Sequence, residues 1–490
     1  MRHEKLRNAR YSISVTLGAC LLAGCSFAPH YQVPKVQVPQ SFKEGGIWAQ
    51  SVPADTLPKG RWWEIYDDET LDALEERIEG ASPTLAEALA RYDAARDYLG
   101  ELRAGLFPTV GIGGHSFANR QSDERPLRSA SQPTYYGDNL VGSSLSYDVD
   151  LWGRVRNAVA AGKSEMQVEA ADLQNVRMSL QAQLADDYVQ LRGLDTQAEL
   201  LRNTIEIYQK ALTLTQDRYA RGIVSGLDVG RAETQLEDAK TTLSDTAARR
   251  ALLEHAIASL VGEPAPTFSV AVIKGTIKLP NVPAGIPSLL LERRPDVAAA
   301  ERTVASMNAR IGIARAAFFP DISLSALVGL QTTGGASLLA APNSYWTLGP
   351  ALALTLLDAG RRKNAVKVAQ ANYAEAAAAY RASVLRAFQE VEDNLSLLGN
   401  LADEAASEAL SAQSSSRTAS IAVALYRNGA VSYLDVVTSQ TTALQAQLAA
   451  LTINTRRLEA SVQLIQATGG GWSKDDLTIV QDGVDLRKMS

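Results

Sequence analysis

An internal duplication constrains this 490-residue chain more than any other feature of its sequence. The segment Tyr219–Asp228 (YARGIVSGLD) returns as Tyr426–Asp435 (YRNGAVSYLD), so the two copies lie 207 positions apart (426 − 219). The Gly-Arg pair at 153–154 returns at 360–361 with the same offset. A unit of about 200 residues written twice predicts one intertwined architecture, in place of the separate domains that the length alone suggests.

Each repeat contains a long window without proline. Proline is absent from residues 134–263 and 351–490, and 69 positions separate the Gly-Arg pair from the glycine of the repeated segment in both windows (222 − 153; 429 − 360). Apolar residues recur there at spacings of three and four, which is typical of coiled-coil seams. A helix of that length measures about 100 Å. We expect two long helices, each followed by a shorter one, over about 153–220, 225–262, 360–427 and 432–467.

A hydrophobic pattern with a period of two residues precedes each long helix. Apolar residues occupy every second position from 322 to 330 and from 348 to 356. Such alternation over about ten residues is typical of strands that span a membrane, although each segment alone is a weak signal. We expect β-hairpins at about 109–149 and 321–357. Two ordinary hairpins on a soluble domain remain the alternative.

Four strands are too few to close a barrel. The smallest single-chain barrels of bacterial outer membranes use about eight strands, and an open sheet edge is not tolerated in hydrocarbon. Long helices that are apolar on one side and polar on the other also need lateral partners. We therefore expect several copies to assemble around an axis, with a copy number that these patterns do not determine.

The N-terminus predicts export and a lipid anchor. Residues 1–24 combine four basic side chains with an apolar stretch too short to cross a bilayer, as in a signal peptide. The stretch ends Leu-Ala-Gly-Cys25, which resembles a bacterial lipobox, so Cys25 is the expected acylated first residue, and Ser26 resembles the second residue of lipoproteins sent to the outer membrane. A plain secretory cleavage site with a leftover thiol is the alternative. No run of 18 uncharged apolar residues follows Cys25, so we predict no transmembrane helix.

Composition argues against several function classes. With 48 basic and 54 acidic side chains, the net charge is −6, which does not favour nucleic acid as a partner. Two cysteines and four histidines are scattered, so we expect neither a disulfide framework nor a metal site. No nucleophile–base pair or phosphate loop is recognisable. We therefore predict a protein that is not an enzyme and that holds no cofactor.

These patterns divide the chain. The predicted segments are a signal peptide (1–24), a lipid-anchored N-terminal segment (25–69), a first repeat (70–265), a linker (266–292), a second repeat (293–472) and a polar tail (473–490).

Several motifs together resemble one family, the TolC-like outer-membrane efflux factors, and within it the OprM-like (NodT-type) lipoproteins. The resemblance covers essentially the whole mature chain and rests on the duplicated turns and on the segments Cys25–Pro34, Trp62–Leu71, Arg293–Glu301, Phe319–Leu324 and Gly469–Trp472. It implies a mainly α fold with a transmembrane β part. Three subunits would each give four strands to a 12-stranded outer-membrane β-barrel, continuous with a periplasmic α-barrel of long coiled-coil helices.

The resemblance also assigns roles at the duplicated turns. It places them at the periplasmic tip, where Asp228 would accept a hydrogen bond from Tyr426, and Asp435 would line a constriction as a ring of three carboxylates. Val431 stands where one lock of the family has an arginine, so the latch should depend less on ion pairs. From the residues themselves, Ser225 with Asp228 and Ser432 with Asp435 equally fit helix capping boxes.

The turns themselves are candidates for partner binding. The turns are small and apolar, and we expect them to be exposed, which suits the docking of hairpins from a periplasmic adaptor. The candidate docking residues are Gly222, Val224, Ser225, Gly429, Val431 and Ser432. A compact turn without a partner is the simpler interpretation.

The expected function is the outer-membrane exit duct of a tripartite efflux system, of the proton-driven multidrug type. Expected partners are two sister subunits, the adaptor, an inner-membrane pump and outer-membrane lipids, but no nucleic acid. Alternatives are a conduit for type I protein secretion or for metal or oligosaccharide export. A lipid-anchored coiled-coil scaffold without a pore is the rival from another class.

Overall fold

The computed structural model describes residues 26–44, 61–126, 129, 131–280, 282, 293–334, 338–470 and 472. The predicted signal peptide, the lipidation site Cys25, residues 283–292 of the predicted linker and the tail after 472 lie outside the described residues.

The chain forms two compact units that each take segments from both repeats. One unit comprises Met1–Pro34, Asp93–Val168 and Ala300–Tyr380; the other comprises Lys35–Tyr92, Glu169–Ala299 and Arg381–Ser490. The sequential division into a first and a second repeat therefore does not describe packing units. Helices of both repeats share buried apolar residues, because the two long helices and the two shorter helices that follow them contribute to one cluster.

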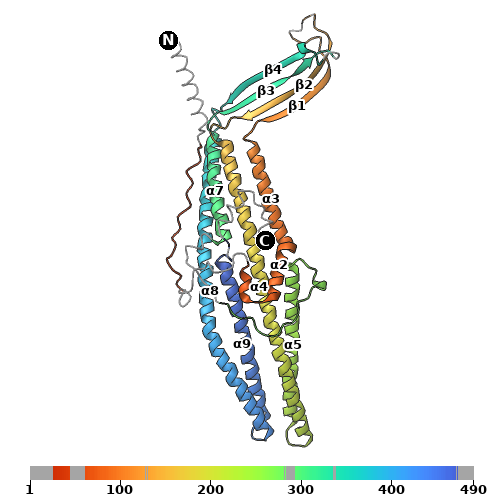
Figure 1. Cartoon of the computed structure of the whole chain (residues 1–490), viewed down its shortest axis with the longest axis vertical. Helices are drawn as coiled ribbons and strands as arrows, with labels where there is room; N and C mark the ends of the chain where they lie inside the picture. Colours follow the sequence, from red (N-terminus) through yellow and green to blue (C-terminus); the bar gives the residue numbers. More distant parts are fainter. Residues whose placement is uncertain are drawn as a thin grey trace. The chain divides into compact units, whose positions relative to one another are not determined.

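Two pairs of helices have matched lengths. The long helices α4 (Arg154–Ala220) and α8 (Arg361–Arg427) have 67 residues each, and α5 (Gly226–Leu260) and α9 (Tyr433–Ala467) have 35 each (Figure 1). These bounds lie within a few residues of those expected from the proline-free windows. Along the expected seams Leu191, Leu201, Val384, Val391 and Leu395 are at most 1% exposed.

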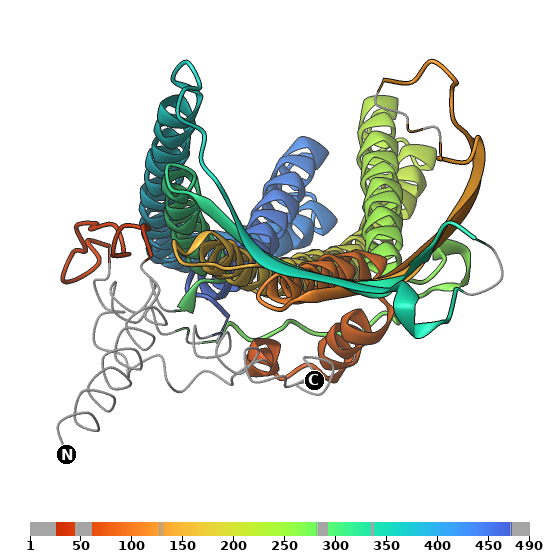
Figure 2. The ribbon, with the colours of Figure 1, turned by 90° about the horizontal axis from the view of Figure 1, so that it is seen from above.

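The first unit contains a curved four-stranded sheet (Figures 1 and 2). Strands β1 (Thr109–Arg120), β2 (Tyr135–Asp148), β3 (Asp321–Thr332) and β4 (Ser344–Ala353) are antiparallel neighbours in that order. Helices α3 (Pro83–Ala104) and α7 (Pro295–Ala316) lead into β1 and β3, whereas α4 and α8 follow β2 and β4. Among the described residues, no helix is long and apolar enough to cross a membrane.

The second unit includes a short N-terminal helical part. It consists of the 3-10 helix η3 (Trp62–Tyr66) and helix α2 (Glu69–Ala81). Trp62 and Trp63 are 1% and 3% exposed, so both side chains are buried. Asp68 caps α2 and also pairs with the buried Arg192 guanidinium of α4 at 2.6 Å. Since a buried charge needs a partner, this pair holds α2 against α4.

Candidate functional site

The four strands separate apolar from polar side chains. Residues that pair directly across strands share a face of the sheet, and the three registers extend each face over the whole sheet. One face carries mostly apolar side chains: Val110, Ile112, Val141, Leu145, Ile322, Leu324, Val328, Leu330, Trp346, Leu348 and Leu352. The other face carries mostly polar or small ones: His115, Asn119, Asp138, Ser144, Ser146, Ser323, Ser325, Gln331 and Thr347.

The apolar face is not covered by the rest of the described chain. Ile112 is 82% exposed, Trp346 77% and Val110 69%. The first and last strands, β1 and β4, form the two edges of the sheet. An antiparallel sheet with one apolar and one polar face suits a boundary between hydrocarbon and water, provided that its edges find partners.

Near the duplicated turns, one apolar cluster contains residues of α4, α5, α8 and α9. Tyr208 and Leu212 of α4, Leu236 of α5, and Tyr426 of α8 with Tyr433 of α9 are buried together there. The Tyr426 and Tyr433 rings meet edge to face, with centroids 5.2 Å apart. Burial raises the pKa of Tyr433 to about 12. The two helical hairpins of one subunit are therefore packed against each other at this tip.

Arg218, near the end of α4, connects the hairpins by a polar contact. Its Nη1 donates a hydrogen bond of 2.6 Å to the carbonyl oxygen of Tyr426, and its guanidinium lies 4.6 Å from the centroid of the Tyr426 ring. Both contacts are favourable for a cation. Sequence reasoning missed this residue. The available signal was that Arg218 aligns with Leu425 in the second repeat (425 − 218 = 207).

The expected hydrogen bond between Asp228 and Tyr426 is not formed within the subunit. The Tyr426 hydroxyl is buried and has no hydrogen-bond partner among the described residues. Asp228 pairs instead with Arg231, three residues further along the same helix, at 3.4 Å. The Asp228 carboxylate is thus paired with a cation of its own helix, and Arg218 contacts the carbonyl of Tyr426 and not its hydroxyl.

The two duplicated turns share their backbone but not their caps. Gly222 and Gly429 have φ of +73° and +75°, the left-handed conformation expected at a helix C-terminus. At the second turn, the backbone N–H and hydroxyl of Ser432 donate to the Asp435 carboxylate at 3.0 and 2.7 Å, within a capping box. At the first turn, Ser225 makes no side-chain cap. The capping interpretation therefore fits the second turn only.

The residues expected to dock a partner are mostly exposed. Gly222, Ser225, Gly429 and Ser432 are exposed, whereas Val224 and Val431 are half-buried. Val431 packs against the tip cluster.

The first turn also exposes a set of large side chains. Tyr219, Ile223 and Leu227 are 54%, 58% and 62% exposed. These three side chains were not among the predicted docking residues, although large apolar residues in an exposed turn are a recognisable signal. This turn therefore presents an uncovered apolar surface at the tip.

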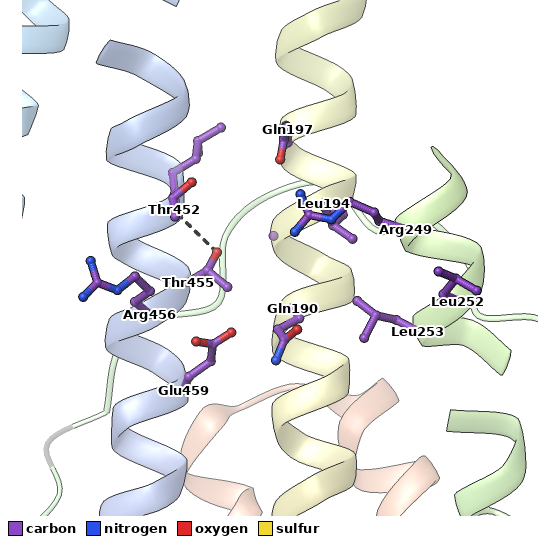
Figure 3. A pocket seen from close by; sticks show the side chains of 12 residues that line it. Gln190, Leu194, Gln197, Arg249, Leu252, Leu253, Thr452, Thr455, Arg456 and Glu459 are labelled. Carbon is purple, nitrogen blue, oxygen red and sulfur yellow. Dashed lines mark hydrogen bonds between the residues drawn. The ribbon is translucent and has the colours of Figure 1, made fainter. Parts of the chain in front are cut away.

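A cavity lies between α4, α5 and α9 in the second unit (Figure 3). Its volume is about 320 Å³, and its lining mixes leucines with Gln190, Arg249, Arg456 and Glu459. Burial raises the pKa of Glu459 and, one turn before Gln190, raises the pKa of Asp186 to about 7. No group of three or more potential metal ligands occurs among the residues that the structure describes.

Comparisons with known proteins point to one family. The family model described as "Outer membrane efflux protein" matches residues 74–263 and 286–470, that is, two spans close to the two expected repeats. The outer membrane protein OprJ of Pseudomonas aeruginosa is 28% identical over 481 residues, 98% of this chain and 99% of that protein. The toluene efflux pump outer membrane protein TtgC of Pseudomonas putida is 28% identical over 462 residues, 94% and 95% of the two chains.

A solved structure is also similar. The outer-membrane channel OprN superposes with a TM-score of 0.86 at 26% identity, covering 91% of this chain and all of that one.

Proposed function

Since this chain belongs to the outer membrane efflux protein family, we propose that it is the outer-membrane channel through which an efflux pump releases its substrates. The two-faced sheet is the observation that carries this function. Its apolar side chains suit lipid, and its polar side chains suit a water-filled lumen. The channel conducts passively and catalyses no reaction.

The pore is built from three copies of the chain. The edges β1 and β4 carry backbone N–H and C=O groups that need partners in hydrocarbon. Pairing β4 of one subunit with β1 of the next supplies these partners, and three copies give a 12-stranded barrel. The same assembly places the α4–α5 and α8–α9 hairpins side by side as a periplasmic tube.

The helical tip is the gate and the docking site for a tripartite assembly. The apolar surface of Tyr219, Ile223 and Leu227, together with the turns at Gly222 and Gly429, suits the hairpins of a periplasmic adaptor that joins the channel to an inner-membrane pump. Asp228, Tyr426 and Asp435 belong to the gate, with Asp435 exposed next to the second turn. Three copies of Asp435 would give a constriction a negative potential.

Cys25 carries the lipid anchor. A lipobox-like sequence directly before it supports this assignment, and several acyl chains at about 0.8 kcal/mol per buried methylene would hold the N-terminus in a membrane.

The cargo is a set of small apolar organic molecules. TtgC, whose name assigns it to a toluene efflux pump, aligns over 94% of this chain. A drug-susceptibility profile of a deletion strain tests this assignment, since a secretion conduit or a metal exporter would leave resistance to organic compounds unchanged.

Planar-bilayer recording tests the pore itself. The purified full-length chain should give discrete single-channel steps that alternate between closed and open levels. A lipid-anchored scaffold would bind the bilayer without conducting, and that result would refute the proposed function.

A further inference from the structure

Two arginines at equivalent positions of the repeats have different partners. Arg250 of α5 and Arg457 of α9 are related by the offset of 207 (457 − 250). The guanidinium of Arg250 pairs with two carboxylates, at 2.6 Å from Nε to Asp195 and 3.2 Å from Nη1 to Glu254. Its Nη2 also donates a hydrogen bond of 2.7 Å to the Val270 carbonyl. The first repeat therefore provides acceptors for each nitrogen of its arginine.

The second repeat lacks both carboxylates. Ala402 stands at the position equivalent to Asp195, and Ser461 at the position equivalent to Glu254 (402 − 195 and 461 − 254, both 207). The Nε–H of Arg457 is buried and has no hydrogen-bond partner among the described residues. A buried N–H without an acceptor is unfavourable, because it has lost its hydration and gained no hydrogen bond in return. Arg457 thus lacks an acceptor that its counterpart has.

Arg457 lines a second cavity of the second unit, between α4, α9 and the segment that follows α5. The volume of this cavity is about 220 Å³. Its apolar lining includes Val189 of α4, Leu458 of α9 and Ile277. Among the described residues that line it, the charged ones are Arg192 and Arg457, and none is acidic. We call this space the two-arginine cavity. It combines an apolar surface with positive charge.

Arg192 contributes a second donor without a partner. It is 6% exposed. Its Nη1 donates to Asp68 at 2.6 Å, and its Nη2 donates to the Gly275 carbonyl at 3.1 Å. These contacts hold the guanidinium in place, whereas its Nε–H is buried without a partner among the described residues. Because Asp68 balances the charge of Arg192, the charge of Arg457 remains in excess at the cavity.

The two-arginine cavity adjoins a close approach of α4 and α9. A Cβ atom added to Gly193 would lie 2.5 Å from the Thr455 hydroxyl oxygen, so the two helices are in contact here. Figure 3 shows Thr455 of α9 pointing toward α4. Arg192 directly precedes Gly193, and Arg457 lies two residues after Thr455. A ligand in this cavity therefore contacts helices of both repeats.

We propose that the two-arginine cavity binds a small organic carboxylate. Its carboxylate accepts hydrogen bonds from the Nε–H groups of Arg192 and Arg457, in the role that carboxylates of the chain itself have in the first repeat. Its apolar body lies against Val189 and Leu458. An engineered protein cavity of about 150 Å³ holds benzene, so a volume of about 220 Å³ accommodates an aromatic ring with a carboxylate. This site lies outside the proposed gate and goes beyond the proposed function.

Calorimetric titration of the detergent-extracted full-length chain with benzoate tests the site. Benzamide has nearly the same shape as benzoate but no charge. Benzoate should bind once per chain and raise the unfolding temperature by mass action, whereas benzamide should bind at least about tenfold more weakly. Equal binding of the two compounds, or no binding at about 10 mM benzoate, would overturn the proposal.

Inorganic phosphate tests the apolar part of the cavity. Phosphate can accept the same hydrogen bonds but has no apolar body to bury, so it should bind more weakly than benzoate. Phosphate that binds as tightly as benzoate would overturn the organic class of ligand.

Two variants test the role of Arg457. Arg457→Met should lower the affinity for benzoate about ten- to a hundredfold, because it removes a charge-assisted hydrogen bond. Ala402→Asp supplies the carboxylate that the first repeat has at the equivalent position, and should weaken benzoate binding by competing for Arg457. The matched control is Arg456→Met, since Arg456 is the neighbouring residue, pairs with Glu404 at 3.7 Å and lines the larger cavity. Its affinity should stay within about twofold of the parent's.

The variants also separate this inference from the proposed function. Unchanged benzoate affinity in Arg457→Met, or an equal loss in Arg456→Met, would overturn the site. If circular dichroism shows that Arg457→Met does not fold, Ala402→Asp decides, and unchanged affinity there would overturn the site. Single-channel conductance of Arg457→Met should match that of the parent. A chain that conducts but does not bind benzoate would refute the site alone, and a chain that binds benzoate without conducting would refute the channel alone.

Discussion

The two copies of the tip turn have the same backbone and opposite surroundings. Tyr426 is 4% exposed and lies in the core that joins the four tip helices, whereas its counterpart Tyr219 is 54% exposed. The glycines that follow them differ by only 2° in φ. Duplication has thus kept the path of the chain, while the repeated tyrosine packs inward at the second turn and faces outward at the first.

The polar contacts of the two turns differ in the same sense. Arg218 precedes Tyr219 and donates a hydrogen bond to the backbone of Tyr426. Leu425, the residue equivalent to Arg218 in the second repeat, is uncharged and cannot form such a contact. Asp435 caps its own helix, whereas Asp228 pairs with Arg231. The second turn therefore contributes Tyr426 and Tyr433 to the tip cluster, whereas Tyr219 of the first turn stays exposed.

The largest expected difference is between alanine substitutions of the two tyrosines. Tyr426→Ala should cost about 3 to 5 kcal/mol of the free energy of unfolding because it empties a buried aromatic site. Tyr219→Ala should cost less than about 0.5 kcal/mol, as is usual for exposed positions. Thermal unfolding followed by circular dichroism measures both. Equal losses would show that the two turns are packed alike.

Removal of the Arg218 charge should have the next largest effect. Arg218→Met keeps the length of the side chain but loses the hydrogen bond and the contact with the Tyr426 ring, together about 1 to 3 kcal/mol. Closed-state lifetimes in single-channel records should shorten. Arg221→Met is the matched control, since Arg221 is exposed three residues further on. If Arg221→Met shortens the closed-state lifetime as much as Arg218→Met does, the contact of Arg218 with Tyr426 does not stabilise the closed state.

Alanine substitutions of the two repeated aspartates should differ less in their effect on the free energy of unfolding. Asp435→Ala removes the acceptor for the Ser432 backbone and should cost about 1 kcal/mol. Asp228→Ala breaks only an (i, i+3) pair on the surface of its helix, and should cost about 0.3 kcal/mol. Chemical denaturation curves of the two variants compare these losses directly. A larger loss for Asp228→Ala would mean that its carboxylate has a further partner in the assembled channel.

The smallest expected change tests the corrected contact of Tyr426. Because its hydroxyl is buried without a partner, Tyr426→Phe should leave stability within about 0.5 kcal/mol or raise it slightly. Its closed-state lifetime should match that of the parent. Frequent opening of this variant would indicate that the Tyr426 hydroxyl does form the hydrogen bond to Asp228 that the family resemblance implies.

Regular patterns were sufficient to predict the four longest helices and the two hairpins of this fold. Repeat offsets and proline-free windows located α4 and α8, and alternation located β3 and β4, because helix and strand periods are direct consequences of which face is buried. The glycines at 222 and 429 were recognisable as helix ends since left-handed backbone favours glycine. The family model then matched both halves.

Side-chain partners were less predictable. Arg218 and Tyr426 are 208 positions apart, and no local pattern says that a cation at one helix end will reach the carbonyl of another. The same limit applies to Phe27, which meets Phe319 only after α7 and β3 are in place. Of the two serine–aspartate pairs with equal spacing, only Ser432 and Asp435 form a capping box. At the other turn, the Asp228 carboxylate pairs with Arg231, so an ion pair competes with the capping contact for the same carboxylate.

Counting the subunits of the purified channel tests the central claim most directly. Native mass spectrometry of the detergent-extracted protein, with electron micrographs of the same sample viewed end-on, should give three copies arranged around a water-filled axis. A stable single copy whose four-stranded sheet stays unpaired at β1 and β4 would contradict the account.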